Sequence, residues 1–112
     1  MMQHKSHALV IGGSLTGLLM ARILANHFDL VTIVERDVYP DQPMPRKGVP
    51  HSRFPHTLML RGQQIFEQLF PGLRAELIGR GAIELDSMQD LIFFTSAGLA
   101  ARAPSDLGDF FQ

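Results

Sequence analysis

The sequence predicts an α/β fold that opens with a strand, a helix and a second strand. Residues 8–11 form a continuous apolar run closed by two glycines, as in a parallel strand covered on both faces. Over residues 14–27 apolar side chains recur at helical spacing, with Arg22 and Asn26 on the other side. Residues 30–34 are a second apolar, β-branched run that ends at Glu35. This order predicts a right-handed β-α-β unit.

The remainder of the chain is less regular. Five prolines between residues 37 and 55 predict a loop without regular structure. A second amphipathic helix is expected after Pro55, with Leu58 on its apolar face, and one or two further turns over 73–80. The final part predicts short strands at 83–85, 91–95 and 99–102, with a turn at 96–98.

Composition narrows the class of protein. The chain has 112 residues, which is one domain by the usual size of domains. A net charge of -1 predicts neither a nucleic-acid partner nor binding to an anionic membrane. The absence of cysteine excludes disulfides, thiolate metal sites and a cysteine nucleophile. No apolar run is long enough for a secretory signal or a membrane span, so a cytoplasmic protein is expected.

The other candidate groups favour structural roles. The five histidines show no metal-ligand spacing, and no serine lies in a nucleophile elbow. We therefore predict no metal site and assign no catalytic residue. The adjacent Arg46 and Lys47 are interpreted as a solvated pair.

Residues 12–17, Gly-Gly-Ser-Leu-Thr-Gly, lie where the first strand meets the first helix, as the dinucleotide fingerprint G-x-G-x-x-G does. Gly12 permits a tight turn, and Gly17 lets the helix pack close to the strand. Ser14 replaces the second glycine and offers a small side chain whose hydroxyl can cap the helix or bind phosphate. The amides and dipole of the helix start then hold phosphates. The predicted phosphate-binding turn contains Gly12, Gly13, Ser14, Thr16 and Gly17.

Glu35 completes the pattern, because it ends the second strand 18 residues after Gly17. An acid at this place accepts hydrogen bonds from the ribose hydroxyls of adenosine and repels a 2′-phosphate, which argues against NADP. The β-α-β unit alone does not show whether the bound nucleotide is NAD or FAD. The competing interpretation is a plain strand-to-helix turn with a solvated Glu35.

Three stretches together resemble the N-terminal part of FAD-dependent monooxygenases of the aromatic hydroxylase type. In that family the second strand ends in Glu-Arg, as at Glu35 and Arg36, and a basic loop leads into a helix through a motif like G-V-P-x-x-R-x-x-H-x-L-x-x-R-G. Residues 48–62 match this motif, with Arg53 as its first arginine. The stretches are LVIGGSLTGLLMARIL, VTIVERD and RKGVPHSRFPHTLMLRGQQIFEQLFPGL, and the resemblance covers residues 7–85.

The resemblance implies a Rossmann-like unit that binds FAD without a covalent bond. It also implies reduction of FAD by NADH or NADPH, and hydroxylation or epoxidation of a small organic substrate by dioxygen. By position Glu35 would contact the adenosine ribose, Arg53 the phosphates or ribityl chain, and Arg36 the adenine side. The flavin would supply the redox chemistry and the protein its position and electrostatics.

Members of this family are several times longer and carry a second FAD motif and a substrate-binding sheet downstream. Residues 86–112 supply neither, and the chain stops without structural closure, so we expect residues 1–112 to be a truncated FAD-binding domain without a substrate domain. In a full-length form NAD(P)H and substrate would join FAD as partners. An open sheet edge would favour self-association. The alternatives are an NAD-binding oxidoreductase module and a non-catalytic remnant or interaction protein.

Overall fold

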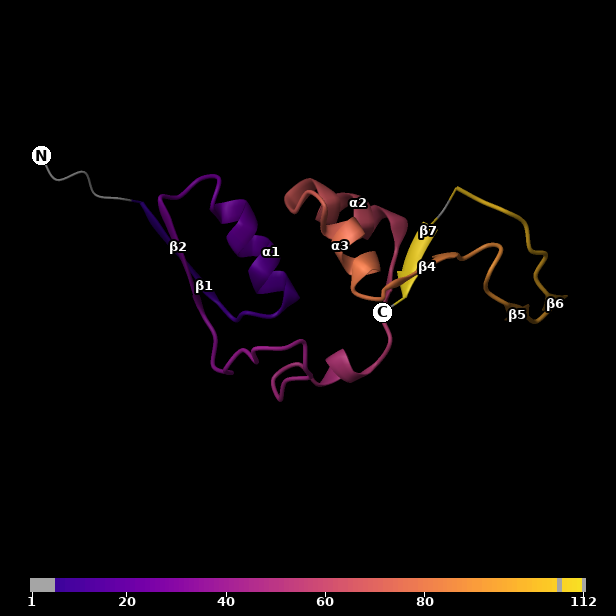
Figure 1. Cartoon of the computed structure of the whole chain (residues 1–112), viewed down its shortest axis with the longest axis horizontal. Coiled ribbons are helices and arrows are strands. Elements are labelled where there is room, and N and C mark those ends of the chain that lie inside the picture. The colour runs from indigo at the N-terminus through magenta and orange to yellow at the C-terminus, as the bar shows by residue number, and fades with distance from the viewer. Residues whose placement is uncertain (1–5, 107, 112) are drawn as a thin grey trace, which may run out of the picture. The chain divides into compact units, whose positions relative to one another are not determined.

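The computed structural model describes residues 6–106 and 108–111. The chain is of mixed α/β type and divides into two compact units, Met1–Phe54 and Pro55–Gln112. Figure 1 shows the helices and strands of both. No helix among the described residues is long and apolar enough to cross a membrane.

The first unit has the expected order of strand, helix and strand. Strand β1 covers His7–Ile11, helix α1 Leu15–Leu24 and strand β2 Leu30–Val34. The two strands are parallel, with Ala8 opposite Val31 and Val10 opposite Ile33, and α1 lies against them (Figure 1). The helix is shorter than the predicted range 14–27, because after Leu24 the chain tightens into turns.

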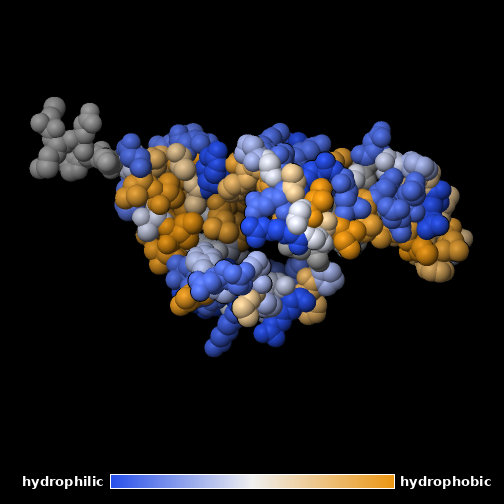
Figure 2. Space-filling model, in the orientation of Figure 1, coloured by the Kyte–Doolittle hydropathy of each residue, from blue (hydrophilic) through white to orange (hydrophobic). Residues whose placement is uncertain are grey.

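Only one face of the two-stranded sheet is covered in this unit. Ala8 and Val10 are buried, whereas the alternate residues of β1, Leu9 and Ile11, are 58% and 85% exposed. The prediction that β1 is covered on both faces was therefore wrong for the described residues. Side chains alternate along a strand, and α1 is the one helix that packs here, so every second side chain faces away from it. Figure 2 shows hydrophobic side chains on the surface of this part of the chain.

The proline-rich loop contains more order than the sequence predicts. A short 3-10 helix, η1, covers Pro50–Arg53, and a single β-bridge joins Arg46 and Val49. Proline is compatible with η1 because it occupies the first helical position, where its missing N–H is not needed. The expectation of no regular structure over residues 37–55 was thus too strict.

The second unit combines two helices with short antiparallel strands. Its sheet has the order β3-β7-β4, with β7 antiparallel to both neighbours. A separate hairpin pairs β5 with β6 across the predicted turn at residues 96–97. The elements are β3 (Thr57–Leu58), α2 (Leu60–Leu69), α3 (Leu73–Gly79), β4 (Ile83–Asp86), β5 (Phe94–Thr95), β6 (Gly98–Leu99) and β7 (Gly108–Phe111).

Three predictions for this unit require correction. Leu58 was assigned to the helix, but it lies in β3, because its backbone pairs with β7. The strands expected at 91–95 and 99–102 shrink to two residues each. The end of the chain was expected to lack structural closure, yet β7 is the central strand of the sheet. For Leu58 and for β7, pairing with distant residues decides the structure.

Gln63 ties α2 to the sheet. Its side chain is 7% exposed, and its amide nitrogen donates hydrogen bonds to the backbone oxygens of Leu58 at 2.9 Å and Gly108 at 2.5 Å. Helix, β3 and β7 therefore share one buried polar group, which satisfies two carbonyls that would otherwise lack these bonds.

We expect Gln63→Met to destabilise the protein by about 1–3 kcal/mol, because methionine keeps the size but leaves both carbonyls unpaired. Urea denaturation measures the change. Gln68→Met, an exposed substitution on the same helix, is the matched control and should change stability by less than about 0.5 kcal/mol. Equal losses in the two variants would show that the Gln63 hydrogen bonds contribute nothing specific.

Candidate functional site

The turn at residues 12–17 begins with a glycine in the left-handed region. Gly12 has φ of +98° and donates its N–H to the backbone oxygen of Val34 at 2.8 Å. A Cβ on Gly12 would meet no atom within 4 Å. Glycine is therefore favoured here by its backbone conformation and not by a lack of room for a side chain. The bond to Val34 joins the turn to the end of β2.

Gly17 brings helix and strand into close approach. A Cβ at this position would lie 1.9 Å from the backbone oxygen of Gly12 and 3.6 Å from Val10 Cγ1. A backbone atom is the main obstacle, so a larger residue would have to push α1 away from β1. This is the close packing for which the sequence analysis expects a glycine.

The first amides of α1 have no acceptor within the helix. Ser14 is the N-cap residue, with an extended backbone and no capping hydrogen bond from its side chain. The first helical bond runs from the Leu18 N–H to the Ser14 oxygen at 3.0 Å, so the amides of Leu15, Thr16 and Gly17 remain for other acceptors. With the helix dipole they form a donor set suited to an anion such as phosphate.

Glu35 is fixed against this turn. Its carboxylate accepts hydrogen bonds from the N–H groups of Gly13 at 2.6 Å and Asp37 at 2.9 Å. These two amides, first that of Asp37 and then that of Gly13, together with the nearby charge of Arg46, hold the pKa of Glu35 below its ordinary value. Since a carboxylate has about four lone-pair sites, it can still accept hydrogen bonds from a ligand hydroxyl.

Tyr39 and Arg46 cover the other side of Gly13. The Gly13 oxygen accepts hydrogen bonds from the Tyr39 hydroxyl at 2.6 Å and from Arg46 Nη2 at 3.2 Å. The Arg46 guanidinium lies over the Tyr39 ring, 4.6 Å from its centre, and Nη1 is 3.8 Å from the Glu35 carboxylate. A Cβ on Gly13 would fall 1.7 Å from the Tyr39 hydroxyl, so a larger residue here would displace the tyrosine side chain from the Gly13 oxygen.

The interpretation of Arg46 as a solvated residue was therefore wrong. Its side chain is only 14% exposed, and its Nη1 atom is buried without a hydrogen-bond partner in the described part of the chain. Tyr39 was missed altogether. The sequence feature that could have indicated it is the presence of an aromatic residue and an arginine in the loop that follows Glu35.

The two other predicted arginines lie apart from this cluster. The Arg36 side chain is 82% exposed and its Nε is 3.9 Å from Asp37 Oδ1. Arg53 is exposed on η1, and within residues 6–106 and 108–111 no hydrogen bond or ion pair joins it to the turn. Of the predicted site residues, the structure brings together those of the turn and Glu35, but not Arg36 or Arg53.

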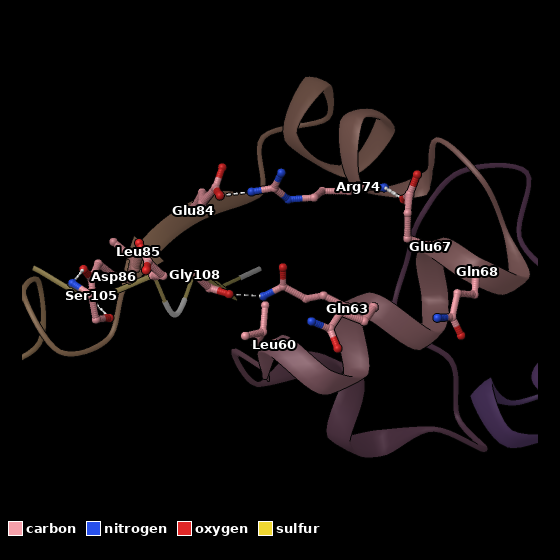
Figure 3. Close-up of a pocket in the computed structure, with 12 residues that line it drawn as sticks. Leu60, Gln63, Glu67, Gln68, Arg74, Glu84, Leu85, Asp86, Ser105 and Gly108 are labelled. Carbon is pink, nitrogen blue, oxygen red and sulfur yellow. Dashed lines mark hydrogen bonds and ion pairs between the residues drawn. The ribbon is translucent and has the colours of Figure 1, made fainter.

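A separate cavity of about 760 Å³ lies in the second unit, where sequence reasoning assigned no site. Figure 3 shows polar side chains of α2, α3 and β4 around it. The sequence feature that could have predicted this cavity is a set of polar residues on one face of a helix. These are residues 63, 64, 67 and 68, which recur at helical spacing. The lining residues are Leu60, Gln63, Gln64, Glu67, Gln68, Arg74, Glu84, Leu85, Asp86, Ser105, Asp106 and Gly108.

Four of the five charged side chains that line this cavity already serve the fold. Arg74 forms an ion pair with Glu84 (Figure 3). Glu67 accepts hydrogen bonds from the N–H groups of Gly72 and Arg74, which start α3. Asp86 accepts hydrogen bonds from the hydroxyl and N–H of Ser105, which lower its pKa. The cavity therefore presents a framework of satisfied groups, and the turn of the first unit is the better candidate site.

The described residues contain no group of three or more histidine, cysteine or acidic side chains that could hold a metal ion. No family model matches the chain. The chain is 44% identical over 94 residues to Protein Rv3254 of Mycobacterium tuberculosis. This alignment covers 84% of the chain and 20% of that protein, so the chain spans about a fifth of the length of this curated relative.

We expect Gly17→Ala to destabilise the protein by about 1–3 kcal/mol, because the added methyl group collides with the Gly12 carbonyl. Thermal or urea denaturation measures the loss. Gly79→Ala is the control, since a Cβ at Gly79 meets nothing within 4 Å, and it should leave stability unchanged or slightly raise it. A neutral Gly17→Ala variant would contradict the close helix–strand contact.

We expect stability to fall in acid. Four carboxylates, those of Asp29, Glu35, Glu67 and Asp86, have pKa values lowered by hydrogen bonds in the folded chain. Their ordinary values are 3.8 for Asp and 4.5 for Glu. The unfolded chain therefore takes up protons first as the pH falls, so stability is full above about pH 5 and declines through these values and below.

Melting temperatures over a series from about pH 7 to about pH 3 measure this decline. Glu35→Gln or Asp86→Asn should each flatten the pH dependence, because one titrating group is lost. A parent chain as stable at the acid end as at neutral pH would rule the hydrogen bonds out as a source of stability.

Proposed function

We propose that the chain is a Rossmann-like unit that binds the ADP part of FAD and belongs to a flavin-dependent monooxygenase. The phosphates would lie at the N-terminus of α1, against the amides of Leu15, Thr16 and Gly17. Glu35 would accept hydrogen bonds from the ribose hydroxyls. Support comes from the geometry of the turn, and for the flavin from the sequence resemblance at Glu35–Arg36 and residues 48–62.

One observation carries the nucleotide proposal. The Glu35 carboxylate is anchored 2.6 Å from the Gly13 N–H, immediately beside helix amides that have no helical acceptor. A carboxylate suited to ribose hydroxyls and helix amides suited to phosphate thus lie beside each other at the ends of two neighbouring strands, which supports a nucleoside diphosphate as the ligand. A solvated strand-end glutamate would be neither anchored nor largely buried.

Arg46 extends this site beyond the predicted residues. Its buried Nη1 atom lacks a hydrogen-bond partner among the described residues and lies 3.8 Å from Glu35. A buried guanidinium N–H without an acceptor is costly, and a phosphate or ribose oxygen would satisfy it. We therefore propose that Arg46 makes the phosphate contact that the family resemblance implies for Arg53.

Bound FAD would supply the redox chemistry, accepting reducing equivalents from NAD(P)H and reacting with dioxygen to oxidise a small organic substrate. The residues described above would bind and orient its ADP half. Because the aligned residues make up only 20% of the relative, the activity of a complete enzyme is proposed from the resemblance alone. An NAD-binding module remains the alternative, since NAD carries the same ADP half.

We expect isothermal titration calorimetry to show binding of FAD and ADP, and weaker binding of ADP that carries an additional 2′-phosphate on its ribose, because this phosphate would meet Glu35. Glu35→Gln should weaken ADP binding by about ten- to a hundredfold, the range for a hydrogen bond to a charged group. Glu76→Gln, an exposed acid on α3, is the matched control and should leave the affinity unchanged.

The outcomes separate the alternatives. FAD bound more tightly than ADP and NADH supports the flavin. NADH bound as tightly as FAD supports the NAD module. The absence of any binding, or unchanged ADP affinity in Glu35→Gln, would refute the nucleotide site.

A further inference from the structure

The cavity of the second unit contains a buried oxygen atom that the fold does not use. The Gln63 side chain is 7% exposed, and its amide nitrogen donates to two backbone oxygens, those of Leu58 and Gly108. Because both partners are acceptors, they fix which end of the amide is the nitrogen. The other end, Oε1, accepts no hydrogen bond from residues 6–106 or 108–111, and Figure 3 shows it directed into the cavity. Since a buried amide oxygen normally has a donor, a ligand N–H group in the cavity would complete Gln63.

The charges of the cavity favour a cationic ligand. Its lining carries four carboxylates but a single guanidinium, that of Arg74, which is already paired with Glu84 (Figure 3). A hollow lined by an excess of one charge attracts ions of the opposite charge. The four carboxylates are those of Glu67, Glu84, Asp86 and Asp106.

Three of these carboxylates keep acceptor sites beyond the bonds that hold the fold. A carboxylate offers about four lone-pair sites. Glu67 uses two of them for the N–H groups of Gly72 and Arg74. Glu84 bonds to the Arg74 guanidinium. The carboxylate of Asp106 forms no hydrogen bond or ion pair with the part of the chain that the structure describes. The cavity therefore offers several free acceptors for positively charged N–H groups.

The arrangement suits an extended cation better than a metal ion. Among the described residues no three histidine, cysteine or acidic side chains converge as a metal site requires, so the carboxylates are spread around the cavity. Its volume of about 760 Å³ lies within the range of small-molecule sites, about 300–1,000 Å³. Leu60 and Leu85 contribute apolar surface to the lining. A chain of methylene groups that carries several ammonium groups matches these features together.

We propose that the cavity of the second unit binds a linear aliphatic polyamine. Oε1 of Gln63 accepts a hydrogen bond from one ammonium group, and the carboxylates with free acceptor sites bind the others through charge-assisted hydrogen bonds. The methylene segments contact Leu60 and Leu85. No residue of the first unit takes part, so this site is separate from the proposed nucleotide site.

The test titrates spermidine into the whole chain at low ionic strength and without nucleotide. Calorimetry measures the affinity, and NMR follows the side-chain amide signal of Gln63, which is assigned through its contacts with Leu58 and Gly108. The side-chain amide of Gln89, which is exposed and outside the cavity, is the internal control. Asp106→Asn removes a carboxylate of the cavity that holds no other element in place.

The matched control is Asp41→Asn, which makes the same change of charge at an exposed residue of the first unit. We expect spermidine to shift the Gln63 signal in a saturable way and to leave that of Gln89 unchanged. Asp106→Asn should weaken binding about two- to fivefold, the effect of losing one exposed ion pair, and Asp41→Asn should leave it unchanged. Mg²⁺ at the same ionic strength should not displace spermidine.

Four results would overturn the proposal: no binding, an unmoved Gln63 signal, equal losses in the two variants, or displacement by Mg²⁺. Displacement by trilysine at a lower concentration than spermidine would also overturn it, and would identify a basic peptide as the occupant. Because nucleotide is left out and the variants lie outside the glycine turn, these results are independent of the proposed FAD site.

Discussion

The hydrogen bond between the Glu35 carboxylate and the Gly13 N–H holds the glycine turn of the first unit against the end of β2. It joins the residue directly after β2 to the turn that follows β1. The same carboxylate accepts a hydrogen bond from Asp37, whose own carboxylate accepts one from the Gly48 N–H. One acidic side chain therefore positions both the glycine turn and the start of the proline-rich loop.

The proline-rich loop also contacts the glycine turn. Tyr39 and Arg46 lie in the proline-rich loop, outside any helix or named strand, and both donate hydrogen bonds to the Gly13 oxygen. They also stabilise each other through a cation–π contact. The absence of a side chain at Gly13 makes room for the tyrosine hydroxyl. Three segments thus meet within one small cluster, in which the Arg46 and Glu35 side chains are each 14% exposed. Hydrogen bonds and charge, more than apolar packing, define this site.

The sequence predicted those elements whose cause is local. Strands β1 and β2 follow from β-branched apolar runs, and α1 from helical spacing after Gly12–Gly13. Strand β7 could not be predicted in this way, because Gly108–Phe111 acquires its structure by pairing with residues 57–58 and 83–86. Burial of Arg46 likewise depends on Tyr39 and Glu35 together. Loop residues such as these do not recur at the spacing of a helix or a strand, so the sequence pattern does not indicate which of their side chains are buried.

The position of β7 between β3 and β4 sets an order of events during synthesis. The β1–β2 pair joins residues about two dozen positions apart, so the first unit can form soon after Val34 leaves the ribosome. The three-stranded sheet cannot exist until residues 108–111 have emerged, and Gln63 has to wait for its Gly108 acceptor. Until then β3 and β4 lack the strand that pairs with both of them, so the sheet of the second unit forms after that of the first.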